Sequence, residues 1–98
     1  MLEQNKTISI PGEEALEVLG EIEFILISLH KIGSYYSDKS KEAYEKATTD
    51  FIDQQMVTAR LAKIRRIITE RFDSSLDDDD MDDIERYLDG MEFWKPIS

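Results

Sequence analysis

Apolar residues in the first third of the chain recur three and four positions apart, which is the period of one face of an α-helix. The repeat lies within residues 13–32 and comprises Ala15, Val18, Leu19, Ile22, Ile25, Leu26, Leu29 and Ile32. Glutamates occupy the first turns, where the helix dipole favours carboxylates, and Gly33 follows the last apolar position. The pattern therefore predicts a helix over residues 13–32.

Three further apolar residues of this segment, Leu16, Phe24 and Ile27, fall outside the main face. They would stay in water if only one neighbour packed against the helix. Because a contiguous exposed apolar patch usually marks an interface, we expect Leu16, Phe24 and Ile27 to form an oligomer interface.

A second apolar repeat runs through residues 40–72 without a glycine or proline. Ser37, Asp38 and Ser40 precede it and are candidate helix caps. The segment predicts a single long central helix of roughly 50 Å at about 1.5 Å per residue.

A third repeat, Met81, Ile84 and Leu88, predicts a short helix over residues 78–90, with aspartates in its first turns. Residues 1–12 read as an extended lead-in to a single helical domain, residues 13–98. The expected fold is all-α, an antiparallel bundle of three helices (13–32, 40–72 and 78–90). Such a chain is only two helices thick at most places, so we expect homo-oligomerisation, most simply a dimer, to complete the bundle.

Composition indicates a globular protein, with 41% hydrophobic and 35% charged residues in a chain of 98. The absence of cysteine excludes disulfides and thiolate metal sites. The longest uncharged apolar run, residues 24–29, is too short to cross a bilayer, and the first residues lack the apolar core of a signal peptide. We therefore expect a cytoplasmic protein that does not bind membranes.

Charge is distributed unevenly along the chain. The formal charge is −4 over residues 1–33, +2 over residues 34–72 and −8 over residues 73–98, which gives −10 in total. A mostly negative field disfavours direct binding of nucleic acid and favours a basic protein partner.

The strongest acidic feature is an aspartate block, which we define as Asp77, Asp78, Asp79, Asp80, Asp82 and Asp83. Its spacing does not fit a calcium loop, because no glycine falls at the sixth position and no glutamate at the twelfth, so we expect no metal. Helix capping uses one or two aspartates. The surplus indicates a surface for a basic partner, or else a solvated acidic face that pairs with the basic stretch of the second helix.

That basic stretch contains Arg60, Lys63, Arg65 and Arg66. Arginine and lysine in such a cluster bind phosphates and carboxylates, so an anionic ligand such as a nucleotide is one interpretation. The other is that these residues pair with the aspartate block folded over them. Tyr35 and Tyr36, adjacent in a predicted connection, are candidates for an exposed partner-binding surface.

No catalytic constellation is apparent, because His30 is the only histidine and no nucleophile or cleft is marked out. We expect a protein that is not an enzyme and that needs no cofactor. The leading hypothesis is a small acidic inhibitor or immunity-type protein that blocks a basic partner such as a toxin or nuclease. The alternatives are an oligomeric protein that sequesters a small anionic ligand, and an adaptor whose first helix docks another protein's helix.

Overall fold

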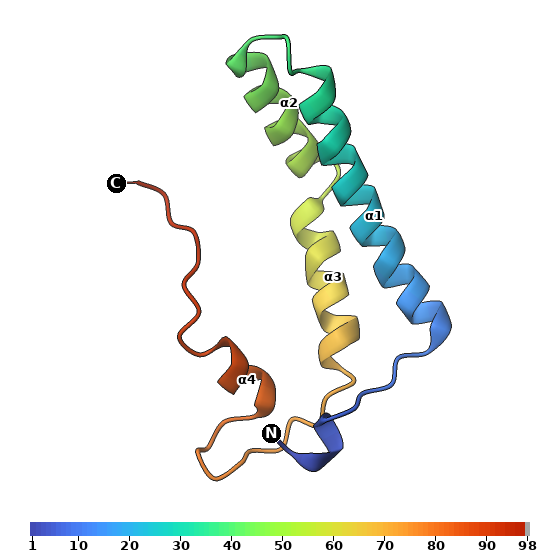
Figure 1. Cartoon of the computed structure of the whole chain (residues 1–98), viewed down its shortest axis with the longest axis vertical. Coiled ribbons are helices and arrows are strands. Elements are labelled where there is room, and N and C mark those ends of the chain that lie inside the picture. Colours follow the sequence, from blue (N-terminus) through green and yellow to red (C-terminus); the bar gives the residue numbers. More distant parts are fainter. Residues whose placement is uncertain (98) are drawn as a thin grey trace. The chain divides into compact units, whose positions relative to one another are not determined.

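The computed structural model describes residues 1–97, and these residues form helices, turns and irregular segments without a strand (Figure 1). The all-α class is therefore confirmed. The chain divides into two compact units. Unit 1 joins the two ends of the chain, Met1–Ser9 and Thr69–Ser98, and unit 2 is Ile10–Ile68.

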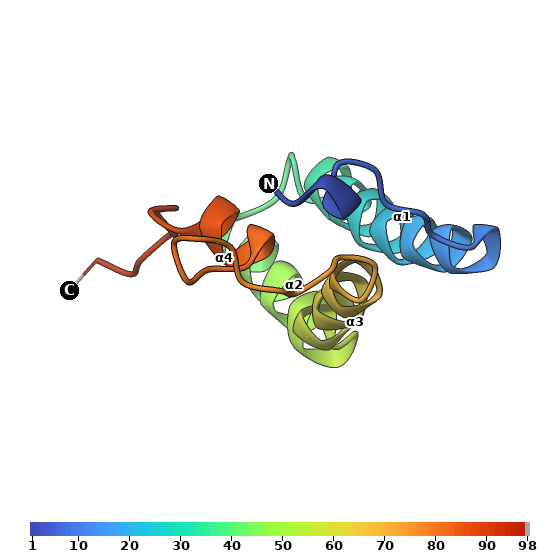
Figure 2. The same cartoon turned by 90° about the horizontal axis from the view of Figure 1, so that it is seen from below.

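Unit 2 contains α1 (Gly12–Tyr35), α2 (Lys41–Gln54) and nearly all of α3 (Val57–Thr69). The chain turns at residues 36–40, and Ser40 caps α2 by accepting a hydrogen bond from the Ala43 amide at 3.1 Å. Viewed from below, α1 forms one layer and α2 with α3 forms the other (Figure 2). The layers meet where the Phe24 and Phe51 rings lie 5.9 Å apart, centroid to centroid.

The prediction of one unbroken helix over residues 40–72 is wrong. The helix ends at Gln54, and Met56 adopts a left-handed conformation with φ of 52° before α3 begins at Val57. The Met56 amide donates to the Asp53 carbonyl at 3.3 Å, and Arg60 Nε donates to the Gln55 carbonyl at 2.7 Å. These bonds satisfy backbone groups that the break would otherwise leave unpaired.

The helix breaks because the inward-facing residues before and after the break do not lie on one face of a continuous helix. A helix continuing from the inward-facing Phe51 would point Thr58 inward, seven residues further on. Thr58 is exposed, whereas Val57, one residue earlier, is buried. The break rotates α3 so that Val57 and Ile64 become its inner face.

Unit 1 contains a single 3-10 turn, η1 (Glu3–Asn5), and the short helix α4 (Asp83–Leu88). The lead-in predicted as extended is thus partly helical, and the helix predicted over residues 78–90 begins five residues late. Asp82 caps α4 by accepting from the Glu85 amide at 2.7 Å. The residues before it form a turn because aspartate side chains compete for nearby backbone amides and consecutive carboxylates repel one another.

Few apolar side chains are buried in the described chain. Ile25, Val57 and Ile64 are the buried hydrophobic residues, and no side chain is completely enclosed. Much of the apolar surface of α1 is exposed. Across residues 1–97, every helix is too short or too polar to cross a lipid bilayer.

Candidate functional site

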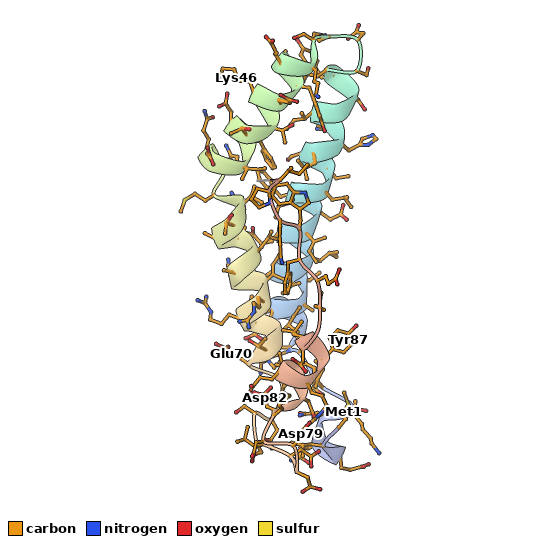
Figure 3. All side chains as sticks on the ribbon, turned by 90° about the vertical axis from the view of Figure 1, so that its left-hand side faces the viewer. Met1, Lys46, Glu70, Asp79, Asp82 and Tyr87 are labelled. Atoms are coloured by element: carbon orange, nitrogen blue, oxygen red, sulfur yellow. The ribbon has the colours of Figure 1, made fainter. Side chains whose placement is uncertain are left out.

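The aspartate block is a folded turn built around Arg86 of α4. The guanidinium donates from Nε and Nη2 to the two carboxylate oxygens of Asp79, at 2.6 and 2.7 Å, as a two-pronged pair. Nη2 also donates to the Met81 carbonyl at 3.1 Å. The pKa of Asp79 is therefore held well below its usual range and that of Arg86 is raised. Figure 3 shows Asp79 and Asp82 at the same end of unit 1 as Met1.

Asp83 joins this turn to the start of the chain. Its Oδ2 accepts from the Leu2 amide at 3.0 Å and from Asn5 Nδ2 at 2.7 Å, and its Oδ1 accepts from Arg86 Nη1 at 2.6 Å. The side chain of Asp83 is 2% exposed. Hydrogen bonds from Asn5, Leu2 and Arg86 lower the pKa of this carboxyl. Asp83 is therefore a structural carboxylate inside unit 1.

Asn5 makes a second set of contacts between the start of the chain and the segment after α3. It is 4% exposed, donates to the Asp73 carbonyl at 2.9 Å and accepts from the Asp73 amide at 2.8 Å. The Asp73 carboxylate in turn accepts from Gln4 at 3.0 Å and from the Ser75 amide at 2.8 Å. Hydrogen bonds from Ser75 and Gln4 lower the pKa of Asp73 to about 2.

Asp77 is half-buried and its carboxylate lies 3.9 Å from Arg86 Nη2, and Asp82 caps α4. Asp78 and Asp80 are therefore left as the outward members of the aspartate block. Both residues are exposed, and Asp80 adopts a left-handed conformation with φ of 59°. Unit 1 carries 12 acidic and 4 basic side chains, a formal charge of −8. Unit 2 carries 10 acidic and 8 basic side chains, a formal charge of −2. The negative field is therefore a property of unit 1.

The basic cluster of α3 is divided between different faces of the helix. Arg60 Nη1 pairs with Glu21 of α1 at 3.0 Å, and the Arg60 guanidinium carbon lies 4.3 Å from the Phe24 ring centroid. Lys63 pairs with Glu17 of α1 at 2.5 Å. In one of the two interpretations these cations pair with the aspartate block, but in the structure they pair with glutamates of the neighbouring helix.

An open pocket of about 400 Å³ lies at the α2–α3 break. It is lined by Glu21, Gln54, Gln55, Met56, Ala59, Arg60 and Lys63. Arg65 and Arg66 are exposed and do not line this pocket. The four basic residues named in the sequence thus do not converge on one ligand, and the two in the pocket face carboxylates.

Tyr35 and Tyr36 form the end of α1 and its cap. Their rings make an edge-to-face pair with centroids 4.9 Å apart, and Lys39 Nζ lies 4.1 Å from the Tyr35 ring centroid. Lys39 also donates to the Tyr35 carbonyl at 3.0 Å. The Tyr35 side chain is 63% exposed. Both tyrosines belong to unit 2, whereas the aspartate block belongs to unit 1.

The three residues expected at an oligomer interface have different surroundings. Leu16 is 68% exposed and Ile27 is 43% exposed. Phe24, 38% exposed, packs on Phe51 and lies under Arg60, so part of its surface is used within unit 2.

Sequence reasoning missed Asn5 and Arg86, which organise unit 1. A signal for Arg86 was present, because it is one of only two basic residues in the segment 73–98. A lone arginine within a run of aspartates has close carboxylate partners on both sides. Asn5 carries no comparable signal, since its partners are 68 and 78 residues away along the chain.

No group of three or more histidine, aspartate or glutamate side chains in the described part of the chain is arranged to hold a metal ion. Comparison of the chain with protein-family models, with curated proteins and with solved structures gives no match.

Proposed function

We propose that this chain is a small acidic binding protein, of the inhibitor or immunity type, whose unit 1 covers a basic surface of a partner protein. The partner class is a toxin, a nuclease or another nucleic-acid-processing protein, because such proteins carry the basic surfaces that a −8 unit complements. The proposal includes no catalysis, no cofactor and a cytoplasmic location.

The observation that carries the proposal is that hydrogen bonds within unit 1 hold the aspartate block in a defined turn. Arg86 and Asn5 hold Asp79 and Asp83 from the inside, and this fixes the backbone from which Asp78 and Asp80 project. A charged surface held in place before binding loses less conformational freedom on association than a mobile acidic tail. Preorganised carboxylates also steer a basic partner into its binding orientation.

The test compares two charge-matched double variants of the full-length chain. Asp78→Asn with Asp80→Asn removes two outward carboxylates from unit 1, and asparagine tolerates the left-handed conformation at position 80. Glu13→Gln with Glu42→Gln removes two exposed carboxylates from unit 2. Tagged wild-type chain first captures the partner from the native host, and calorimetry then measures the affinity of each variant for the purified partner.

We expect the aspartate variant to bind about tenfold more weakly and the glutamate variant to bind within about twofold of wild type. Wild-type affinity should also fall when salt rises from about 50 to about 500 mM, which shortens the Debye length about threefold. Equal affinities for the two variants, or an acidic partner bound independently of salt, would contradict the proposal.

A second candidate function is binding of a small anionic ligand at the α2–α3 pocket. The presence of Arg60 and Lys63 in its lining favours this function, and their pairing with Glu21 and Glu17 reduces the positive field there. A thermal-shift panel of nucleotides and inorganic phosphate tests it, since a ligand at 100 times its dissociation constant adds about 2.7 kcal/mol to stability. No shift with any of these anions would exclude the candidate.

We also propose that the layers of unit 2 form an antiparallel bundle that is completed by homo-oligomerisation. The exposed apolar residues of α1 support this, because an isolated two-layer unit leaves them in water.

A further inference from the structure

α1 carries two separate apolar rows. The first, Val18, Ile25 and Ile32, repeats every seven residues and includes the buried Ile25. The second consists of Ala15, Leu19, Ile22, Leu26, Leu29 and Gly33, at spacings that alternate strictly between four and three. We call this second row the outer seam. An average spacing of 3.5 residues is the repeat of a coiled-coil contact between two helices.

The outer seam lies beside the inner row of α1 and is partly exposed to solvent. Leu19 is 51% exposed, Ile22 42%, Leu26 57% and Leu29 40%. At 3.6 residues per turn, its centre lies roughly 80° around the helix from the row of Val18, Ile25 and Ile32. In a square four-helix bundle each helix touches two neighbours, so it needs two contact rows nearly at right angles to each other.

The outer seam is self-complementary when two copies run in opposite directions. Antiparallel pairing about its centre places Ile22 opposite Leu26, Leu19 opposite Leu29, and Ala15 opposite Gly33. Large residues then meet large residues, and the small residues meet at both ends. A twofold-symmetric interface requires this kind of match of a surface with itself.

Gly33 supports close approach by another molecule. A Cβ atom added at Gly33 would meet no other atom of the chain within 4 Å, as at the other glycines, so the space beside this turn of α1 is open. Glycine inside a helix costs about 1 kcal/mol relative to alanine. A second helix packing against this turn would explain it, because small residues let helix backbones come close.

Charge along α1 selects the antiparallel direction. Residues 12–23 contain five glutamates and no basic residue, and residues 24–35 contain Lys31 and His30 but no carboxylate. Antiparallel pairing puts the acidic half of each helix beside the other half of its partner. Parallel pairing would place the two acidic halves together.

We propose that a second copy of this chain packs its α1 antiparallel against α1 along the outer seam, forming a twofold-symmetric dimer. The proposal moves the oligomer interface from Leu16, Phe24 and Ile27 to the row formed by Leu19, Ile22, Leu26 and Leu29. It does not depend on the acidic surface of unit 1, so the two proposals can fail separately.

Sedimentation equilibrium of the full-length chain tests the interface. Wild type should have twice the mass of one chain at micromolar concentration. Leu26→Lys, inside the outer seam, should weaken the dimer at least 100-fold, whereas Leu16→Lys, at a more exposed leucine outside the seam, should leave it within about threefold of wild type. Circular dichroism checks that both variants keep wild-type helicity.

A second substitution separates loss of the interface from loss of the fold. Gly33→Leu raises helix propensity, and it adds bulk at the position where the partner's Ala15 should pack. We expect this variant to be at least as helical as wild type and yet to dimerise at least tenfold more weakly. A monomeric wild type, or a dimer that Leu16→Lys disrupts and Leu26→Lys does not, would overturn the proposal.

Engineered cysteines test the direction, because the natural chain has none. In an antiparallel dimer, Leu19→Cys in one copy faces Leu29→Cys in the other, whereas two copies of Leu19→Cys lie about 15 Å apart along the axis. A disulfide needs Cα atoms about 4.4–6.8 Å apart. Oxidation of an equimolar mixture should therefore give the mixed disulfide and little of either homodimer. Efficient cross-linking of Leu19→Cys alone would show a parallel pair and overturn the proposal.

Discussion

Asp83 shows how one carboxylate can hold together segments from opposite ends of the chain. Its two oxygens accept hydrogen bonds from the Leu2 amide, the Asn5 side chain and Arg86. A buried carboxylate is stable only when donors replace the water that it loses, and here three donors do so. The same bonds favour the ionised form and lower the pKa of Asp83.

We predict that unit 1 loosens in acid. The pKa of Asp73 is about 2 in the folded chain, against an ordinary value of 3.8 for an aspartate in an unfolded chain. Its stabilising contribution is therefore complete above pH 3.8 and is lost as the pH falls through about 2. Asp79 and Asp83 act in the same direction, because their folded pKa values are also lowered. Amide exchange measured by NMR should show Leu2 and Asn5 losing protection between about pH 4 and pH 2.

The control for this prediction is a pair of aspartate-to-asparagine variants. Asp83→Asn should reduce the protection of the Leu2 and Asn5 amides already at neutral pH, because it removes a charged acceptor. Asp78→Asn should leave the acid profile unchanged, because Asp78 is exposed at the outside of the turn. Protection at Leu2 and Asn5 that stays constant down to about pH 2 would be incompatible with the carboxylate contacts.

At the scale of elements, the break between α2 and α3 depends on one strained residue. Met56 has φ of 52°, and a left-handed conformation costs a non-glycine residue about 1–2 kcal/mol. Its side chain is 65% exposed, so replacing it loses little packing. The chain tolerates this strain because the break brings Val57 and Ile64 to the inner face.

Met56→Gly should therefore stabilise the protein by about 0.5–1 kcal/mol, since relief of the strain exceeds the entropy that glycine adds to the unfolded chain. The matched control is Gln54→Gly, two residues earlier at the last residue of α2, which has no left-handed strain to relieve and should destabilise by up to about 1 kcal/mol. Urea unfolding followed by circular dichroism measures both. Destabilisation by Met56→Gly as large as that of Gln54→Gly would indicate a continuous helix.

The sequence predicted the elements better than their boundaries. The apolar repeat of α1 and the cap at Ser40 identified the first helix and the start of the second, because both signals are local. No glycine or proline marks the break at Met56. The only sequence signal was that the apolar residue after Phe51 stands at position 57, one residue before the position 58 that a continuous helix would turn inward. α1 looked like one wide stripe because its inner row and its outer seam are adjacent on the helix.

The sequence predicted which residues belong to the candidate site, but not how their side chains are arranged. The aspartate block was apparent as an acidic run, but its internal partner Arg86 and its distant partner Asn5 decide which carboxylates face outward. Long-range hydrogen bonds of this kind leave no periodic trace in a sequence. Glu17, which pairs with Lys63, was recognised only as one of the glutamates in the first turns of the first helix, and Glu21, which pairs with Arg60, was given no role.

At the scale of the whole molecule, most of the negative charge lies in unit 1 and the outer seam lies in unit 2. Unit 1 carries a formal charge of −8, and unit 2 presents the outer seam, whose six positions contain no charged residue. In our proposals, unit 1 binds a basic partner and unit 2 binds a second copy. The two associations should respond to different variables, salt and pH for unit 1 and protein concentration for unit 2.

Hydrogen exchange at two protein concentrations makes this separation measurable. A chain at 100 times its dimer dissociation constant is stabilised by about 2.7 kcal/mol, which slows exchange about 100-fold wherever opening requires the dimer to separate. We expect amides of α1 to gain protection of that order between dilute and concentrated samples, and amides of residues 77–83 to change less than about threefold. Leu26→Lys should abolish the concentration effect in α1, because it removes the contact that the partner makes. If concentration protected the aspartate turn as strongly as α1, self-association would involve unit 1, and its acidic surface would not be available to a different protein.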